Sequence, residues 1–281
     1  MNDSDAVRFL NDVAHDAEVV RTEHPDAAMI WRLWGEGPTL VLLHGGSGSW
    51  MHWIHTIETF RGTHRVIAAD LPGLGDSEEP ERGYTAESLA DIVSAGIDEL
   101  VADHEPFHLV GFSFGGIIGS HVVSRQRGQV KGLSICGSPP FGMPSTGDAN
   151  NIEPVDTAMS FADSEAIHRR NLARLMIADE NRIDALAVRI HYENLRRARL
   201  RSRKIARTDT MAKAMSIAPC RVHGIWGGSD VTIHPDLGTV RRLFTEHAHG
   251  GTFVSFDGVG HWAPYEAPRR FNEALAKSIE S

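Results

Sequence analysis

The chain has 281 residues, of which 41% are hydrophobic and 23% charged, a balance typical of a globular protein with one large core. Its 28 Lys and Arg residues against 37 Asp and Glu give a net charge of −9, which argues against nucleic-acid or anionic-membrane partners. The N-terminus has no signal-peptide pattern, and no run of about 18 apolar residues could span a bilayer. Cys136 and Cys220 lie in strand-like apolar segments, where unpaired core thiols are expected. We therefore expect a cytoplasmic protein.

The first part of the chain predicts one helix and three strands. Residues 4–15 carry apolar side chains at i, i+3, i+4 and i+7, which indicates an amphipathic helix. This helix either docks on the body of the protein or forms a homodimer contact. Residues 18–21 and 28–34 are expected to form a hairpin. The continuously apolar run 39–43 is typical of a strand buried on both faces, and it leads into a Gly-rich loop at 44–50.

Strands and helices then alternate, which favours an α/β fold with a mostly parallel central sheet flanked by helices. Further strands are predicted at residues 64–70, 107–110, 130–136, 220–226 and 252–256. Helices are predicted after Thr85, at 115–123 and 237–244, and from about 268. Residues 139–218 show helical patterns and no convincing strand, so we interpret them as a helical insertion. In such sheets the reacting groups gather at the carboxyl ends of the strands.

A G-x-S-x-G sequence, Gly111-Phe-Ser-Phe-Gly115, lies between the strand at 107–110 and a helical run. A strand-to-helix turn of this sharpness strains its central residue and leaves no room for side chains two positions away on either side. The turn would lift the hydroxyl of Ser113 off the sheet and place the amide of Phe114 at a helix N-terminus. Ser113 is therefore the candidate nucleophile.

A serine hydroxyl is a poor nucleophile at neutral pH and needs a general base that an acid orients. Asp230 and His261 each follow a predicted strand within a Gly-containing loop, and they come after Ser113 in the order Ser, Asp, His. Asp230 could instead be an ordinary turn or capping aspartate, because Ser-Asp in a loop commonly has that role.

The order and spacing of five segments resemble those of the α/β-hydrolase superfamily over almost the whole chain. These segments are His44-Gly-Gly-Ser-Gly48, Asp70-Leu-Pro-Gly-Leu-Gly-Asp-Ser77, Gly111-Phe-Ser-Phe-Gly115, Gly228-Ser-Asp230 and Gly260-His-Trp-Ala-Pro264. The resemblance implies a core domain of residues 1–138 and 219–281, with residues 139–218 as a helical cap over the pocket.

The resemblance also assigns roles to single residues. Ser113 resembles the nucleophile, His261 the general base and acid, and Asp230 the orienting acid. The oxyanion hole would use the amides of Phe114 and Gly46, with Ser47 as the alternative to Gly46. His44 is interpreted as a support for this loop, and the aspartates of the 70–77 segment as structural.

No metal or other cofactor is implied. The chain has 16 histidines but no H-E-x-x-H sequence, and its histidine pairs lack a carboxylate or thiol at zinc spacing. The glycine loops also lack the G-K-[ST] sequence of a P-loop.

The insertion contains seven arginines between residues 189 and 207, four of which, Arg196, Arg199, Arg203 and Arg207, would share one face of a continuous helix. That face is either solvated or contributes an arginine that binds a substrate carboxylate.

The segment 171–195 and the His261-Trp262 pair resemble hydrolases that cleave carbon–carbon bonds in ring-fission products. Phe112 and His191 depart from that pattern, because those enzymes carry Asn and Arg at the matching positions. The residues expected to line the substrate pocket are Gly45, Phe112, Trp262, His191, Arg189, Met159, Phe161 and Met176.

The sequence thus predicts a serine hydrolase of small to medium carboxylic esters or lactones. One alternative is a carbon–carbon bond hydrolase acting on vinylogous diketones. Another is a ligand-binding receptor that uses the same fold without catalysis. Epoxide hydrolases and dehalogenases of this superfamily attack with Asp, so Ser113 is incompatible with their mechanism.

Overall fold

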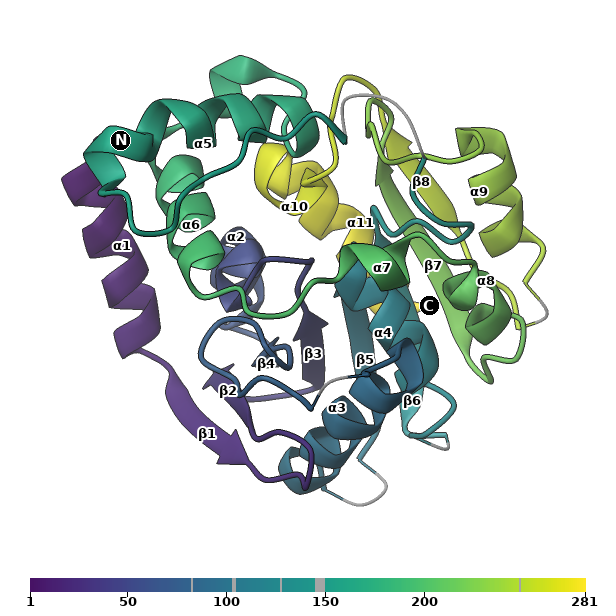
Figure 1. Cartoon of the computed structure of the whole chain (residues 1–281). Helices are drawn as coiled ribbons and strands as arrows, with labels where there is room; N and C mark the ends of the chain where they lie inside the picture. The colour runs from purple at the N-terminus through teal and green to yellow at the C-terminus, as the bar shows by residue number, and fades with distance from the viewer. Residues whose placement is uncertain (82, 103–104, 127, 145–149, 248) are drawn as a thin grey trace.

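A computed structural model describes residues 1–81, 83–102, 105–126, 128–144, 150–247 and 249–281 (Figure 1). Eight strands form one sheet in the order β1-β2-β4-β3-β5-β6-β7-β8. Strands β3 to β8 pair in parallel, whereas β2 pairs antiparallel with both β1 and β4. The strands are β1 (Glu18–Thr22), β2 (Met29–Trp34), β3 (Thr39–Leu43), β4 (Arg65–Asp70), β5 (Phe107–Phe112), β6 (Val130–Cys136), β7 (Arg221–Gly227) and β8 (Phe253–Phe256).

Helices cover both faces of this sheet. The apolar side chains of α3, α4, α8 and α9 belong to one buried cluster, and those of α1, α2, α5, α6 and α11 belong to the other. The helices are α1 (Asp3–His15), η1 (Trp50–Trp53), α2 (Ile54–Phe60), α3 (Ala86–Leu100), α4 (Phe114–Val122), α5 (Phe161–Leu175), η3 (Glu180–Arg182), α6 (Ala185–Arg196), α7 (Arg203–Ala206), α8 (Thr210–Met215), α9 (Leu237–Thr245), α10 (Ala263–Glu266) and α11 (Pro268–Glu280). The predicted fold class, a mostly parallel sheet flanked by helices, is confirmed.

Local sequence signals account for several of these elements. All five residues of β3 are buried, as the unbroken apolar run predicted for a central parallel strand. Helix α3 begins at a capping box, in which Thr85 Oγ1 accepts from the Ser88 amide and Ser88 Oγ accepts from the Thr85 amide. The prediction that Thr85 caps this helix is confirmed.

Helix α1 is docked on the protein. Its residues Ala6, Leu10 and Val13 are buried, and Trp34 Nε1 donates to the Val13 carbonyl over 2.9 Å. Helix α1 packs against α6, and the two helices lie side by side in Figure 1. The docked alternative for this helix is confirmed, and its role in a homodimer stays a prediction.

The segment between β6 and β7 contains α5, η3, α6, α7 and α8, and no strand among its described residues. The prediction of one continuous arginine face is wrong, because α6 ends at Arg196 and α7 begins only at Arg203. Between them, the amides of Arg199 and Leu200 donate to the Gly73 carbonyl over 2.8 and 3.0 Å. These bonds hold the connection against the 71–77 loop of the core instead of continuing the helix.

Two further predictions concern the core and the membrane. Cys136 and Cys220 are both buried and unpaired, as predicted. In the described part of the chain, no helix combines the length and the apolar character that crossing a membrane requires.

Candidate active site

Ser113 lies at the turn between β5 and α4 and has φ 51° and ψ −114°, a left-handed conformation that is strained for a residue with a side chain. The neighbouring glycines make the turn possible. A Cβ atom at Gly111 would lie 2.5 Å from Gly116 Cα, and one at Gly115 would lie 2.1 Å from the Leu43 carbonyl oxygen. The Ser113 backbone is held by its amide, which donates to the Cys136 carbonyl over 2.8 Å, and by its carbonyl, which accepts from Ser138 Oγ over 2.6 Å.

Three side chains form a continuous hydrogen-bonded chain at the carboxyl ends of the strands. His261 Nε2 lies 3.0 Å from Ser113 Oγ, and His261 Nδ1 lies 2.9 Å from Asp230 Oδ2. Asp230 and His261 are both buried. Because a carboxylate can only accept, Nδ1 carries the proton and Nε2 is free to accept from the serine hydroxyl. The structure therefore brings together the three residues that the sequence predicted from separate loops.

Thr232 was not predicted from the sequence, although it completes the surroundings of the acid. Its hydroxyl and its amide donate to Asp230 Oδ1 over 2.7 and 2.8 Å, and its Oγ1 also lies 3.1 Å from His261 Nδ1. A carboxylate that accepts from the amide two residues later is a common turn motif. The spacing Asp-x-Thr was therefore a usable signal for this residue.

The loop after β3 supplies the predicted oxyanion-hole residues. Gly45, Gly46 and Ser47 line the same cavity as Phe114 and Ser113. Ser47 has a φ of 50°, the second left-handed non-glycine residue of the described chain. A Cβ atom at Gly46 would approach Ser202 Oγ to 2.2 Å, so any larger residue would have to displace the Ser202 side chain.

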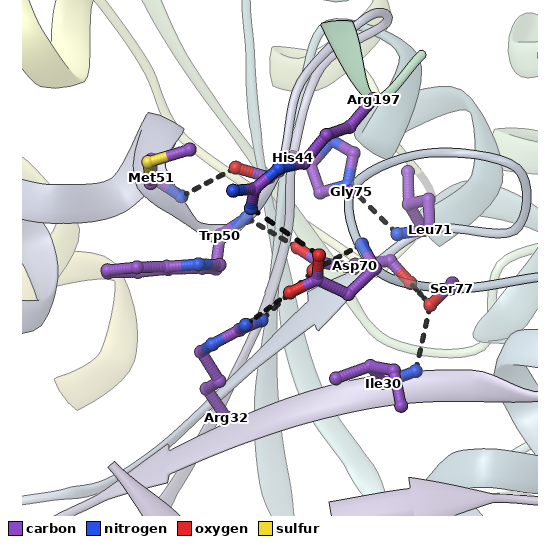
Figure 2. A network of polar contacts seen from close by, with 12 residues as sticks. Ile30, Arg32, His44, Trp50, Met51, Asp70, Leu71, Gly75, Ser77 and Arg197 are labelled. Carbon is purple, nitrogen blue, oxygen red and sulfur yellow. Dashed lines mark hydrogen bonds and ion pairs between the residues drawn. The ribbon is translucent and has the colours of Figure 1, made fainter. Parts of the chain in front are cut away.

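His44 and Asp70 fix that loop on the sheet, as Figure 2 shows. His44 Nε2 accepts from the Leu71 amide over 2.9 Å, so its Nδ1 carries the proton and donates to the Gly45 carbonyl over 2.7 Å. Burial lowers the pKa of His44, against the opposing charge of Asp70, and keeps the ring neutral. Asp70 accepts from the Trp50 amide over 2.9 Å and from Arg32 Nη1 over 3.0 Å.

Above Ser113 lies a cavity of about 310 Å³, large enough for a small organic molecule. Its wall combines apolar and polar side chains, and one of the polar residues, His52, was not predicted from the sequence. The lining residues are Gly45, Gly46, Ser47, His52, Phe112, Ser113, Phe114, Met143, Ile152, Glu153, Val155, Thr157, Asn171, Leu175, Met176, His191, Leu195, Ser202, Arg203, Ala206, Thr232 and His261.

Of the residues predicted for the pocket, Gly45, Phe112, Met176 and His191 lie on this wall. Trp262 does not, because its ring stacks on Tyr265 at 4.3 Å and its Nε1 donates to the His52 carbonyl over 2.9 Å.

The other three predicted pocket residues also lie outside the described cavity wall. Arg189 Nε and Nη2 donate to the Asp3 carboxylate over 2.9 and 2.5 Å, and its guanidinium lies 3.6 Å from the centre of the Phe161 ring. Phe161 also packs edge-on against Tyr192, whose hydroxyl donates to the Met159 carbonyl over 3.4 Å. These side chains join α5, α6 and α1 instead of facing a ligand.

In the described ranges, no group of three or more His, Cys, Asp or Glu side chains is arranged to hold a metal ion.

A sequence model of the alpha/beta hydrolase family matches residues 40–274. The chain belongs to the alpha/beta hydrolase family. It is 28% identical over 260 residues to a soluble epoxide hydrolase from Corynebacterium sp. (strain C12), a match that covers 84% of this chain and 87% of the relative. The chain is thus a hydrolase of this superfamily by sequence as well as by fold.

Solved structures of other alpha/beta hydrolases share the fold. An esterase from Rhodococcus sp. ECU1013 is similar with a TM-score of 0.77 and 21% identity, covering 95% of this chain and 99% of that one. A meta-cleavage product hydrolase from Pseudomonas fluorescens IP01 has a TM-score of 0.73 and 23% identity, covering 90% of this chain and 94% of that one. At these identities the likeness shows the fold and leaves the reaction to the residues of the site.

Proposed function

We propose that this alpha/beta hydrolase is a serine hydrolase of small to medium carboxylic esters, lactones included, and that it works through an acyl-enzyme. The observation that carries the proposal is the hydrogen-bonded chain Ser113–His261–Asp230 at the wall of a cavity of about 310 Å³. A buried acid, a base of fixed tautomer and a strained serine are the parts that acyl transfer requires.

In this mechanism Ser113 Oγ attacks the acyl carbon while His261 Nε2 takes the hydroxyl proton. The developing oxyanion would be bound by the amides of Phe114 and Gly46, or Ser47 in place of Gly46, each contributing roughly 3–4 kcal/mol. His261 then protonates the leaving alcohol, which departs and leaves the acyl group on Ser113. Finally, His261 activates a water molecule that hydrolyses this ester and restores the free serine.

Ser113 distinguishes this chain from its epoxide-hydrolase relative. As the family resemblance implies, epoxide hydrolases and dehalogenases attack with a carboxylate at this position. A serine at the same turn favours acyl transfer.

Cleavage of carbon–carbon bonds is the rival reaction, and two wall residues disfavour it. Phe112 places an aromatic ring against His261, with 5.0 Å between the ring centres, where those enzymes have an Asn side chain. His191 replaces their arginine, and burial, together with the nearby His168, lowers the pKa of His191 to about 3. At neutral pH this ring carries no charge with which to bind a substrate carboxylate.

A panel of aryl esters, lactones and one vinylogous diketone tests the proposal. We expect turnover of esters or lactones and no cleavage of the diketone. Diketone cleavage without ester turnover would favour the carbon–carbon hydrolase. A folded protein that turns over none of them would favour a ligand-binding receptor.

A further inference from the structure

Two histidines of the insertion contact each other at the cavity wall, and His191 is the one that lines the cavity. His168 on α5 and His191 on α6 approach with their Nδ1 atoms 2.7 Å apart, and their rings are nearly perpendicular at 76°. A hydrogen bond between two ring nitrogens needs one protonated and one bare atom. At least one of the two Nδ1 atoms is therefore unprotonated, and its ring is neutral.

The two rings differ in what surrounds their other nitrogen. His168 is buried, and its Nε2 has no hydrogen-bond partner among the described residues. His191 is largely enclosed by the protein, but part of its surface stays accessible and lines the cavity. No partner for its Nε2 occurs in the described part of the chain, so this atom is available to a molecule in the cavity.

The buried end of the pair decides the tautomer. If His191 donated to His168, the buried Nε2 of His168 would be an N–H donor without an acceptor. In folded proteins, buried N–H donors without an acceptor are rarer than buried acceptors without a donor. His168 Nδ1 is therefore the donor, and His191, whose Nδ1 accepts, carries its proton on Nε2.

We propose that His191 is a substrate-binding residue, whose Nε2–H donates a hydrogen bond to a second, neutral oxygen acceptor on the ester substrate, such as a ketone or amide carbonyl. This inference rests on the proposed function. It names a substrate class for the same cavity: esters or lactones that carry a further uncharged carbonyl.

Two other polar residues of the wall, Asn171 and Glu153, are already bonded to the protein. The Asn171 side chain accepts from the Glu153 amide over 2.8 Å and donates to the Glu153 carbonyl over 2.9 Å. The Glu153 carboxylate binds Arg170 and Arg174 over 2.8 and 2.7 Å. Neither residue therefore has a free polar group to compete with His191 Nε2 for a ligand.

The position of His191 relative to the reacting serine is fixed through its helix. Asn194, one turn further along α6, accepts at Oδ1 from Ser49 Oγ over 2.6 Å. Ser49 belongs to the loop that supplies Gly46 and Ser47, so α6 is tied directly to the predicted oxyanion hole. His191 lines the same cavity as Ser113. The bond between Asn194 and Ser49 therefore helps to fix the position of His191 relative to the oxyanion-hole loop.

Paired p-nitrophenyl esters test the inference. Each acyl chain is compared with its equivalent bearing one ketone, at successive positions, and kcat/KM is measured for both. We expect at least one keto ester to be turned over about fivefold to tenfold better than its hydrocarbon counterpart, the size of one net hydrogen bond.

Three variants separate the donor from general packing. His191→Phe keeps a ring without a donor and should abolish the preference for the keto ester. His191→Gln restores an N–H donor and should recover a preference. Leu195→Ala, on the same wall one turn along α6, should change both rates in parallel and leave their ratio intact.

Nitrogen-15 spectra of the whole protein give a second readout, with His191 assigned by its loss in His191→Phe. The expected tautomers are Nε2-protonated for His191 and Nδ1-protonated for His168. The opposite tautomers, or a keto preference that survives in His191→Phe, would overturn the inference. Equal turnover of all matched pairs would overturn the inference alone, whereas no turnover of any ester would overturn the proposed function as well.

Discussion

Thr232 Oγ1 donates to Asp230 Oδ1 over 2.7 Å, while His261 Nδ1 bonds to the other carboxylate oxygen, Oδ2, over 2.9 Å. Both oxygens of Asp230 are therefore occupied, one by Thr232 and one by the imidazole. A carboxylate held at both oxygens cannot rotate away from the histidine, so Thr232 acts as a positioning residue for the predicted base.

Thr232→Val, which keeps the shape of the side chain and removes its hydroxyl, should lower kcat about fivefold to tenfold with little change in KM. The reason is the loss of one net hydrogen bond, about 1–1.4 kcal/mol, while the Thr232 amide still donates to the same carboxylate oxygen. Steady-state ester hydrolysis measures this effect. Thr232→Ser should recover most of the rate. A Val variant as fast as the wild type would show that the Thr232 hydroxyl does not position Asp230 for catalysis.

Substitution of two glycines of α4 by alanine should affect the stability of the fold differently. Gly115→Ala places a methyl group 2.1 Å from the Leu43 carbonyl oxygen, a contact with rigid backbone, and should destabilise the fold by more than about 3 kcal/mol. Gly119→Ala meets only side chains at 3.4 Å or more and should be neutral or stabilising by up to about 1 kcal/mol. Urea unfolding of both variants checks the pair. Equal stabilities would contradict the packing described at the turn.

Arg189 should contribute to stability and not to substrate binding. Arg189→Met and Asp3→Asn each remove the ion pair between α6 and α1 and should lower the free energy of unfolding by about 1 kcal/mol. Because they share one interaction, the double variant should lose clearly less than the sum of the two. The KM for an anionic ester, relative to a neutral one, should stay at the wild-type value in Arg189→Met. A selective rise in that ratio would instead show that Arg189 binds the anionic substrate.

The contrast between Ser113 and Arg189 indicates which site residues could be predicted from the sequence. Ser113, Asp230 and His261 were predictable because each lies at the end of a strand, and a parallel sheet brings those ends together whatever the side chains around them. Arg189, Met159 and Phe161 were not, because the face that a helix of the insertion turns to the cavity depends on its packing against α1 and its neighbours. The prediction of one arginine face was wrong for a similar reason. The amides of Arg199 and Leu200 bond to the Gly73 carbonyl, far away in the sequence, and these bonds interrupt the helix.

A buried histidine far from the site should make stability depend on pH. His108 lies within β5 and bonds through Nε2 to Ser134 Oγ over 2.9 Å; burial first, then the charges of His223 and His64, lower its pKa to about 3. In the unfolded chain this histidine has a pKa of about 6.5. Between these two pKa values the unfolded chain binds more protons than the native protein, so stability falls as the pH drops through that range. The limiting slope is about 1.4 kcal/mol per pH unit for one histidine.

His108→Gln, which can still bond to Ser134, should therefore lose less stability than the wild type between pH 7 and pH 5. Urea unfolding at the two pH values measures the difference. Identical losses in both proteins would show that His108 does not titrate as its surroundings imply.

The central claim is that Ser113 is the nucleophile of an acyl-enzyme. Incubation of the folded protein with a fluorophosphonate, followed by mass spectrometry of its peptides, tests this most directly. We expect a stoichiometric adduct on Ser113 and none in Ser113→Ala, which should stay folded. Ester hydrolysis by the wild type should fall in proportion to labelling. An unlabelled Ser113 in a protein that still hydrolyses esters, or near wild-type turnover by Ser113→Ala, would contradict it.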